Sequence, residues 1–188
     1  KYINENEDFD YVVPMDGDGE DRPEELSLLL EKTKEYPNKV ITADRIKRSE
    51  GFIFKFCYLV HKYLTYIFTG QSIKFGNYTC LPKFVVNKMI NEPSTWVSFS
   101  GSLAKLIKDR ISIPSIRGFR YFGPSKMSFW NLIKHSLSII AVFKKTTIIR
   151  TIFFLFFYIL FVYQFLSIIT LIPVFGIMAL IYTVISIS

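Results

Sequence analysis

Cysteine and histidine are scarce in this 188-residue chain. The two cysteines, Cys57 and Cys80, form no C-x-x-C pair and have no zinc-site spacing, so a disulfide framework and a zinc site are not indicated. The two histidines, His61 and His135, each lack a second metal ligand at helical spacing. These absences exclude a disulfide-stabilised scaffold and a site built on Cys/His pairs.

Acidic residues are almost absent after residue 50. Residues 1–50 carry 14 of the 16 acids and a net charge of −6, whereas residues 51–150 carry a net charge of +13. Residues 151–188 contain no Asp, Glu, Lys or Arg, so the formal net charge of +7 hides three different segments. The basic middle segment indicates an anionic partner such as a membrane surface, nucleic acid or phosphate.

The uncharged final segment favours the membrane. It reads "TIFFLFFYILFVYQFLSIITLIPVFGIMALIYTVISIS", and because one bilayer crossing needs about 20 apolar residues, its 38 residues suit two spans. Pro173 and Gly176 predict the break, since proline is tolerated in the first turn of a new helix. We expect a first span from Ile148 to about Leu171 and a second from Pro173, which stops after about 16 residues and falls short of a full crossing.

Positive charge before the first span predicts the topology. Lys144, Lys145 and Arg150 precede it, and positively charged flanks stay in the cytoplasm. We therefore expect an integral membrane protein whose upstream region is cytoplasmic. The start at Lys1 and the short second span are typical of a fragment.

The first fifty residues have an α/β pattern. Residues 11–15 predict a short buried strand, residues 23–36 a helix and residues 39–45 a second strand. Strand, acidic loop, helix and strand together predict an α/β unit, in which ligands bind at the carboxyl ends of the strands.

Two further apolar stretches predict helices. Residues 52–69 are interrupted by Lys55, His61 and Lys62, which favours a helix under the domain or on the bilayer surface over a span. Residues 127–143 predict an amphipathic helix lying in the membrane interface. An ordinary domain helix packed on the sheet is the alternative for this second stretch. Its expected apolar face consists of Phe129, Leu132, Ile133, Leu137, Ile140 and Phe143.

Negative charge is most concentrated in "DYVVPMDGDGEDRPEELSLLL", which holds seven carboxylates within residues 10–25. Asp16 and Asp18 are separated by a glycine, and such a pair can hold Mg²⁺ together with substrate phosphates. A calcium loop beginning at Asp16 would need Gly and Glu where Asp21 and Ser27 stand, so that interpretation fails.

Several ordered motifs give the chain a family resemblance. "MDGDGEDRPEEL" resembles the "MDADLQDPPEEI" segment of membrane-bound family 2 glycosyltransferases, the branch of dolichyl-phosphate mannose synthases and bacterial polyprenyl-phosphate glycosyltransferases. "VITADRIKR" is similar to the family's "VYGVRKKR", and "GNYTCLPK" falls where the family has "GDFRLLSR". "RGFRYFGPSK" matches R-x-x-R-x-x-G-x-S-K. The residues carried over from "VITADRIKR" and "RGFRYFGPSK" are Arg45, Arg48, Arg117, Arg120, Gly123, Ser125 and Lys126.

The resemblance implies a fold and an activity. It implies part of a GT-A (Rossmann-like) domain at 1–126, a juxtamembrane amphipathic helix at 127–147 and a transmembrane hairpin at 148–188. The implied reaction is inverting transfer of a sugar from a nucleotide-diphosphate sugar to an undecaprenyl or dolichyl phosphate. The implied partners are this donor, this acceptor and the lipid bilayer, with no nucleic acid, and oligomerisation through the hairpin stays open.

The resemblance also implies residue roles. Asp16 and Asp18 would hold Mg²⁺ or Mn²⁺ against the donor diphosphate, and Asp18 and Asn77 would lie at the catalytic centre. The implied phosphate-binding residues are Arg45, Arg48, Arg117, Arg120, Ser125 and Lys126. Contact with lipid headgroups or solvent is the alternative for Arg117, Arg120 and Lys126.

The chain departs from the family pattern in ways that leave alternatives open. Asn77 stands in place of an aspartate, Thr79 in place of an arginine and Glu20 in place of a glutamine, and the nucleotide-binding first strand with its P-x-x-N-E loop does not occur. We therefore expect the fragment not to be competent alone. A membrane scaffold that binds lipid phosphate is the alternative function favoured by Asn77 and Thr79. A processive polysaccharide synthase would carry Q-x-x-R-W, which is absent.

Overall fold

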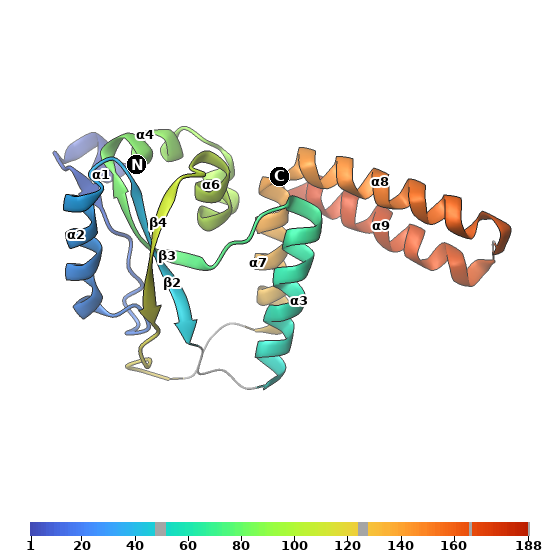
Figure 1. Ribbon diagram of the computed structural model, residues 1–188, viewed down its shortest axis with the longest axis horizontal. Coiled ribbons are helices and arrows are strands. Elements are labelled where there is room, and N and C mark those ends of the chain that lie inside the picture. Colours follow the sequence, from blue (N-terminus) through green and yellow to red (C-terminus); the bar gives the residue numbers. More distant parts are fainter. Residues whose placement is uncertain (48–51, 124–127, 166, 188) are drawn as a thin grey trace.

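The computed structural model describes residues 1–47, 52–123, 128–165 and 167–187, and shows an α/β domain followed by a long helical hairpin (Figure 1). The elements before the hairpin are α1 (Tyr2–Asn6), β1 (Tyr11–Val12), the 3-10 helix η1 (Pro23–Glu25), α2 (Leu26–Glu35), β2 (Val40–Lys47), α3 (Phe52–Thr69), β3 (Phe75–Pro82), α4 (Lys83–Ile90), α5 (Ser94–Val97), α6 (Phe99–Leu106), β4 (Arg110–Ile116) and α7 (Phe129–Val142). The hairpin consists of α8 (Lys144–Val162), the 3-10 helix η2 (Tyr163–Phe165) and α9 (Ile168–Ile187).

The sheet has four strands in the order β1-β3-β2-β4. β3 is antiparallel to both of its neighbours, and β2 and β4 are parallel. It follows that β1, β2 and β4 all point the same way, so their carboxyl ends lie at one edge of the sheet. The predicted strand at 39–45 is confirmed as β2, whereas the strand predicted at 11–15 is shorter, because Pro14 has no N–H for the ladder.

Helix α2 covers one face of the sheet, and together with η1 it confirms the helix predicted at 23–36. Leu29 of α2 is fully buried against residues that alternate along three strands. That buried cluster consists of Leu29, Ile41, Ala43, Tyr78, Cys80 and Ile113. β4 lies at the sheet edge, which explains why Pro114 is accommodated in it.

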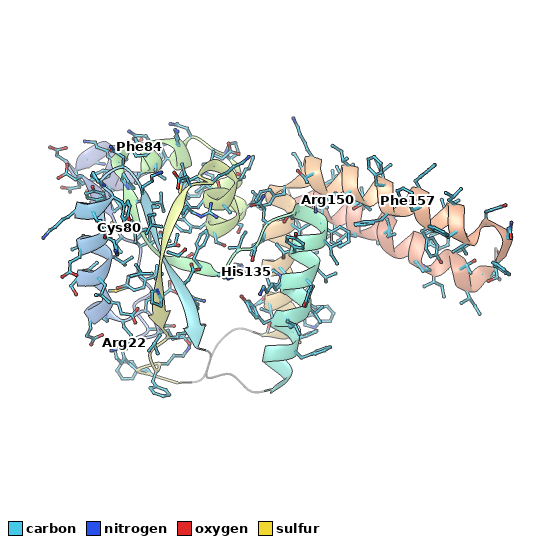
Figure 2. All side chains as sticks on the ribbon, viewed as in Figure 1. Arg22, Cys80, Phe84, His135, Arg150 and Phe157 are labelled. Carbon is cyan, nitrogen blue, oxygen red and sulfur yellow. The ribbon has the colours of Figure 1, made fainter. Side chains whose placement is uncertain are left out.

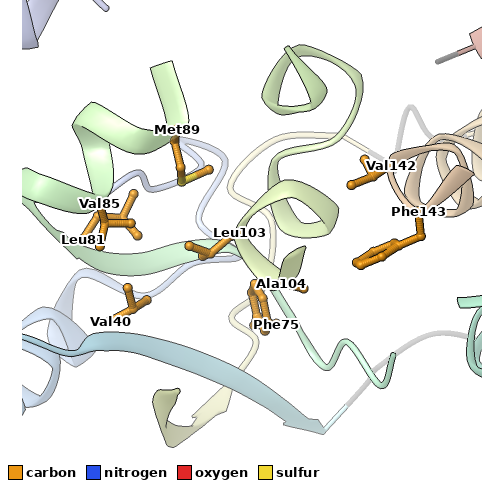
Figure 3. Close-up of a cluster of buried hydrophobic side chains, with 9 residues drawn as sticks. All are labelled: Val40, Phe75, Leu81, Val85, Met89, Leu103, Ala104, Val142 and Phe143. Carbon is orange, nitrogen blue, oxygen red and sulfur yellow. The ribbon is translucent and has the colours of Figure 1, made fainter. Parts of the chain in front are cut away.

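Helices α4 and α6 cover the opposite face and join it to α7. Figure 3 shows the side chains that fill this layer, with Val142 and Phe143 from the end of α7 facing residues of the sheet and of α6. The cluster consists of Val40, Phe75, Leu81, Val85, Met89, Leu103, Ala104, Val142 and Phe143. The last turn of α7 is buried, whereas Phe129 and Trp130 in its first turn are 54% and 71% exposed. The end of α7 therefore packs on the domain, as the alternative interpretation expected, and the position of its exposed aromatic first turn in a membrane interface stays a prediction.

Helices α3 and α7 contact each other between the sheet and the hairpin, and both run across the direction of α8 and α9 (Figure 1). The helix predicted at 52–69 is confirmed as α3, and its exposed side includes Phe56, Tyr63 and Tyr66. Arg150 of α8 lies at the end of α3 (Figure 2). Its Nη1 donates to the carbonyl oxygens of Tyr66 at 3.2 Å and Ile67 at 2.9 Å, in the last turn of α3.

The predicted pair of apolar C-terminal helices is confirmed. The segments Lys144–Phe165 and Ile168–Ile187 are long and apolar enough to cross a membrane, and only 6% of an apolar 18-residue stretch in each is buried within the protein. Side chains such as Phe157 point outward from the pair (Figure 2). Tyr158 Oη donates to the carbonyl oxygen of Thr170 at 2.8 Å and links the two helices.

The predicted break at Pro173 is wrong. Pro173 lies inside α9, and the second apolar helix has 20 residues, not 16. The helix begins earlier because Ser167 N–H donates to Thr170 Oγ1 at 2.8 Å and Thr170 N–H donates to Ser167 Oγ at 3.4 Å. This reciprocal cap satisfies backbone donors that a helix start leaves free, so it sets the start of α9 ahead of the proline.

Arg150→Gln tests the link between α3 and the hairpin. The carbonyls of the last helical turn lack intrahelical partners, and a cation there is favoured by the helix dipole. We expect the variant to lose about 1–2 kcal/mol of stability, measured as a lower thermal unfolding midpoint in detergent micelles. Lys144→Gln removes an exposed positive charge from the same helix and serves as the control. Equal midpoints for the two variants would refute the capping role.

Candidate functional site

The acidic loop, residues 16–21, follows β1 at the edge where β1, β2 and β4 end. Two internal hydrogen bonds shape it: Asp16 N–H donates to Asp21 Oδ2 at 3.0 Å, and Glu20 N–H donates to Asp18 Oδ1 at 3.0 Å. Gly19 has a φ of 89°, a conformation that favours glycine. The loop is thus a compact turn that brings several carboxylates together.

The arginine loop, residues 117–121, follows β4 and packs directly on the acidic loop. Arg120 Nη1 lies 3.1 Å from Asp18 Oδ2, and Arg120 Nε donates to Glu20 Oε1 at 2.9 Å. Arg117 forms an ion pair with Glu20 Oε2. Two segments about a hundred residues apart in sequence therefore contact each other through ion pairs and a charge-assisted hydrogen bond.

Backbone contacts fix the same two loops together. Gly118 N–H donates to the Glu20 carbonyl at 2.9 Å, and Tyr121 N–H donates to the Asp18 carbonyl at 3.0 Å. A Cβ added to Gly19 would lie 2.9 Å from the Phe119 carbonyl oxygen, and one added to Gly118 would lie 2.3 Å from the Gly19 oxygen. The close approach of the backbones therefore requires both glycines.

β2 and β3 supply two more side chains at this edge. Arg45 Nη2 lies 3.8 Å from Asp21 Oδ1, and Asn77 Nδ2 donates to Asp16 Oδ1 at 3.4 Å. Asn77 lies near the start of β3, which runs opposite to its neighbours, so it reaches the edge where the other strands end. Arg45 thus contacts the last carboxylate of the acidic loop, and Asn77 contacts the first.

Buried polar contacts hold the base of the site. Glu25, in η1, accepts hydrogen bonds from Ser115 Oγ at 2.6 Å and from Ile116 N–H at 3.1 Å, and so ties the start of α2 to the end of β4. Tyr78 Oη donates to the Arg22 carbonyl at 2.8 Å. Burial, together with the nearby Glu25 and Asp21 carboxylates, raises the pKa of Tyr78 to about 12, so its hydroxyl remains a donor at neutral pH.

Desolvation also affects charged groups of the site. Asp21 is only 5% exposed, and burial raises the pKa of its carboxyl despite the hydrogen bond from Asp16 and the nearby Arg45. Burial also lowers the pKa of the Arg117 guanidinium. The loops thus take charges partly out of water, which strengthens the interactions between them.

The donor set suits a hard cation only in part. Asp16 and Asp18 offer the carboxylate oxygens that Mg²⁺ and Mn²⁺ prefer, with room in such sites for substrate phosphate oxygens. Across the described segments, no three His, Cys, Asp or Glu side chains form a group that could hold a metal ion. Two carboxylates therefore fit a cation shared with a diphosphate, and the Arg120 pair with Asp18 would have to open for it.

The structure brings together the predicted site residues that it describes: Asp16, Asp18, Arg45, Asn77, Arg117 and Arg120. Arg48, Ser125 and Lys126 lie outside the described residues. Glu20 and Asp21 were not predicted as site residues, although the sequence placed them in the acidic loop. Their place in the site depends on their ion pairs with Arg45, Arg117 and Arg120, and the strand order brings those arginines to the acidic loop.

A separate polar pocket of about 240 Å³ is lined by Asp44, Ser72, Lys74, Phe75, Arg110 and Ser112. None of the predicted site residues that the structure describes lines this pocket. Arg45 follows Asp44 directly in β2, but consecutive residues of a strand project from opposite faces of the sheet.

Comparison with known proteins gives a similarity to a sugar transferase. No family model matches the sequence. The chain is 30% identical over 131 residues to the undecaprenyl-phosphate 4-deoxy-4-formamido-L-arabinose transferase of Klebsiella pneumoniae (strain 342). The match covers 66% of this chain and 38% of that transferase, so the chain corresponds to about two fifths of its relative's length.

Gly19→Ala tests the contact between the two loops. The left-handed backbone and the approach of Phe119 and Tyr121 predict a loss of about 1–3 kcal/mol in stability, read as a lower unfolding midpoint. Gly17→Ala is the matched control, because no atom lies within 4 Å of its added Cβ. A Gly19 variant as stable as the Gly17 variant would contradict the close approach.

Asp21→Asn tests the cost of burying charge in the acidic loop. A raised pKa means that the folded state binds the proton of Asp21 more tightly than the unfolded state does. Protonation of Asp21 therefore stabilises the fold fully below the ordinary value of 3.8, and this stabilisation is lost as pH rises through the pKa of the folded state. We expect the variant, which keeps an oxygen acceptor for Asp16 N–H, to unfold at a higher temperature than the parent at pH 7. This difference should shrink as pH falls toward 4. A pH-independent difference would show that Asp21 does not titrate with unfolding.

Proposed function

We propose that this protein contributes to an inverting sugar transfer from a nucleotide-diphosphate sugar to a polyprenyl phosphate at the cytoplasmic face of a membrane. The proposal takes the α/β domain as part of a GT-A domain of the family 2 glycosyltransferase type. The transferase similarity and the two apolar helices support a membrane-bound lipid acceptor. Undecaprenyl and dolichyl phosphates both suit this acceptor chemistry.

The observation that carries the proposal is the meeting of the acidic and arginine loops. Carboxylates that suit a cation and guanidinium groups that suit phosphates lie in direct contact at the carboxyl edge of the sheet. Ligands of open α/β sheets bind at this edge. A diphosphate donor and a phosphate acceptor need both kinds of group in one place.

Asp16 and Asp18 are the residues that would hold Mg²⁺ or Mn²⁺. The bound cation would neutralise negative charge on the donor diphosphate as it leaves. Asn77 would orient Asp16 through its amide donor, since an amide cannot accept the proton that a general base must take. Arg117 and Arg120 would bind phosphate oxygens beside the carboxylates, and Arg45 would hold Asp21 in place.

The reaction needs little help from a base. A phosphate monoester has its second pKa near 6, so a polyprenyl phosphate is already largely a dianion at neutral pH. One of its oxygens would attack the anomeric carbon and form the new C–O bond, while the bond from that carbon to the donor diphosphate breaks. The nucleoside diphosphate leaves with the bonding electrons, which makes charge stabilisation by the arginines the main task of this site.

A non-catalytic scaffold that binds lipid phosphate is the second candidate function. Asn77 favours this scaffold, because an amide stands where the family 2 glycosyltransferases that the chain resembles have an aspartate. The two functions differ in one measurable respect, since a scaffold would bind polyprenyl phosphate without moving a sugar to it.

The test uses the full-length protein in membranes with polyprenyl phosphate, Mn²⁺ or Mg²⁺ and a panel of labelled nucleotide sugars. We expect label in the lipid phase, at least a hundredfold less of it with Asp18→Asn, and loss of label with a chelator. Glu24→Gln, an exposed acid outside the loop network, is the control and should retain activity. Binding of polyprenyl phosphate with no transfer across the panel would favour the scaffold.

A further inference from the structure

Glu20 has an unusual position between two cations. Its carboxylate contacts Arg120 through Oε1 and Arg117 through Oε2, and its side chain is only 14% exposed. Its backbone carbonyl accepts a third bond from the arginine loop, from Gly118 N–H. One residue of the acidic loop therefore makes three of the contacts that hold the arginine loop in place.

Asp18 and Glu20 hold Arg120 in different ways. Asp18 contacts the terminal Nη1 of Arg120 and is 33% exposed, whereas Glu20 contacts Nε, nearer the side-chain stem, and is less exposed. If Asp18 turned to a cation, Arg120 would lose its contact at Nη1 and keep its contact at Nε. The freed Nη1 would then face the position that Asp18 had occupied, next to the cation and its phosphates.

We propose that Glu20 is a positioning residue that keeps Arg117 and Arg120 beside the diphosphate when Asp18 is engaged by the cation. The inference rests on the proposed function and adds a role for a residue that the metal-site hypothesis leaves unexplained. A carboxylate can accept from two guanidinium groups at once, whereas a glutamine would present its NH₂ group to one of them. In this chain, Glu20 serves the arginines and not the cation.

The role predicts a specific pattern of binding by the full-length protein. In Glu20→Gln we expect affinity for inorganic pyrophosphate with Mn²⁺ to fall about tenfold by calorimetry, because both arginines lose their common acceptor. Affinity for Mn²⁺ alone, measured by electron paramagnetic resonance, should change less than twofold. Asp18→Asn should lose Mn²⁺ binding, and Glu24→Gln should match the parent in both measurements.

A double-mutant cycle separates positioning from a general loss of structure. If Glu20 acts through the arginines, Glu20→Gln should weaken pyrophosphate binding no further in a protein that already carries Arg117→Gln and Arg120→Gln. An additional tenfold loss in that background would overturn the proposal. So would a Glu20→Gln variant whose Mn²⁺ affinity falls as far as that of Asp18→Asn, because Glu20 would then be a metal ligand.

Hydrogen exchange tests the same contact without any ligand. The amides of Gly118 and Tyr121 are expected to exchange about tenfold faster in Glu20→Gln than in the parent, while amides of the β2–β4 ladder stay unchanged. Unchanged exchange at both amides would overturn the proposal even if the parent transfers sugar. Faster exchange together with no sugar transfer by the parent would contradict the proposed function and leave the positioning of the arginine loop established.

Discussion

The ion pairs between the acidic loop and the arginine loop are the interactions on which the candidate site depends. They form because β1, β2 and β4 run in one direction and end at one edge of the sheet. The acidic loop leaves β1, Arg45 lies toward the end of β2, and the arginine loop leaves β4. A sheet with a different strand order would separate the same charges. The two loops lie about a hundred residues apart in sequence, so only the sheet brings them into contact.

This arrangement explains how the chain tolerates so much negative charge in one short segment. Glu20 pairs with Arg117, Asp18 pairs with Arg120, and Asp21 lies near Arg45. Arginines of the protein itself therefore neutralise much of this negative charge. Burial makes the two ion pairs of Glu20 depend on one another, since removing this carboxylate leaves the Arg117 and Arg120 guanidinium groups without it in a poorly solvated place. Binding of a phosphate ligand would then exchange partners among existing charges, at lower cost than desolvating new ones.

Helices α3, α7, α8 and α9 contact one another and form a second structural unit beside the sheet. Helices α3 and α7 lie across the direction of α8 and α9, and Arg150 connects the end of α3 to the first apolar helix. The last turn of α7 shares a core with the sheet, through Val142 and Phe143. Packing therefore connects the α/β domain to the two apolar helices through buried side chains, which limits how freely the domain can move relative to them.

The sequence by itself determined the features that depend on local pattern. Apolar length predicted two helices at the C-terminus, and local apolar pattern predicted α2, α3 and α7. The spacing of Asp16 and Asp18 indicated a cation site, and the family resemblance added Arg45, Arg117 and Arg120. Local pattern did not predict the start of α9, because the side-chain cap at Ser167 and Thr170 outweighs the signal of Pro173. Only the tertiary structure decided that Glu20 joins two arginines and that Asn77 reaches Asp16. Those contacts depend on strand order and on close backbone approach at Gly19 and Gly118, which are properties of the assembled sheet and of no single segment.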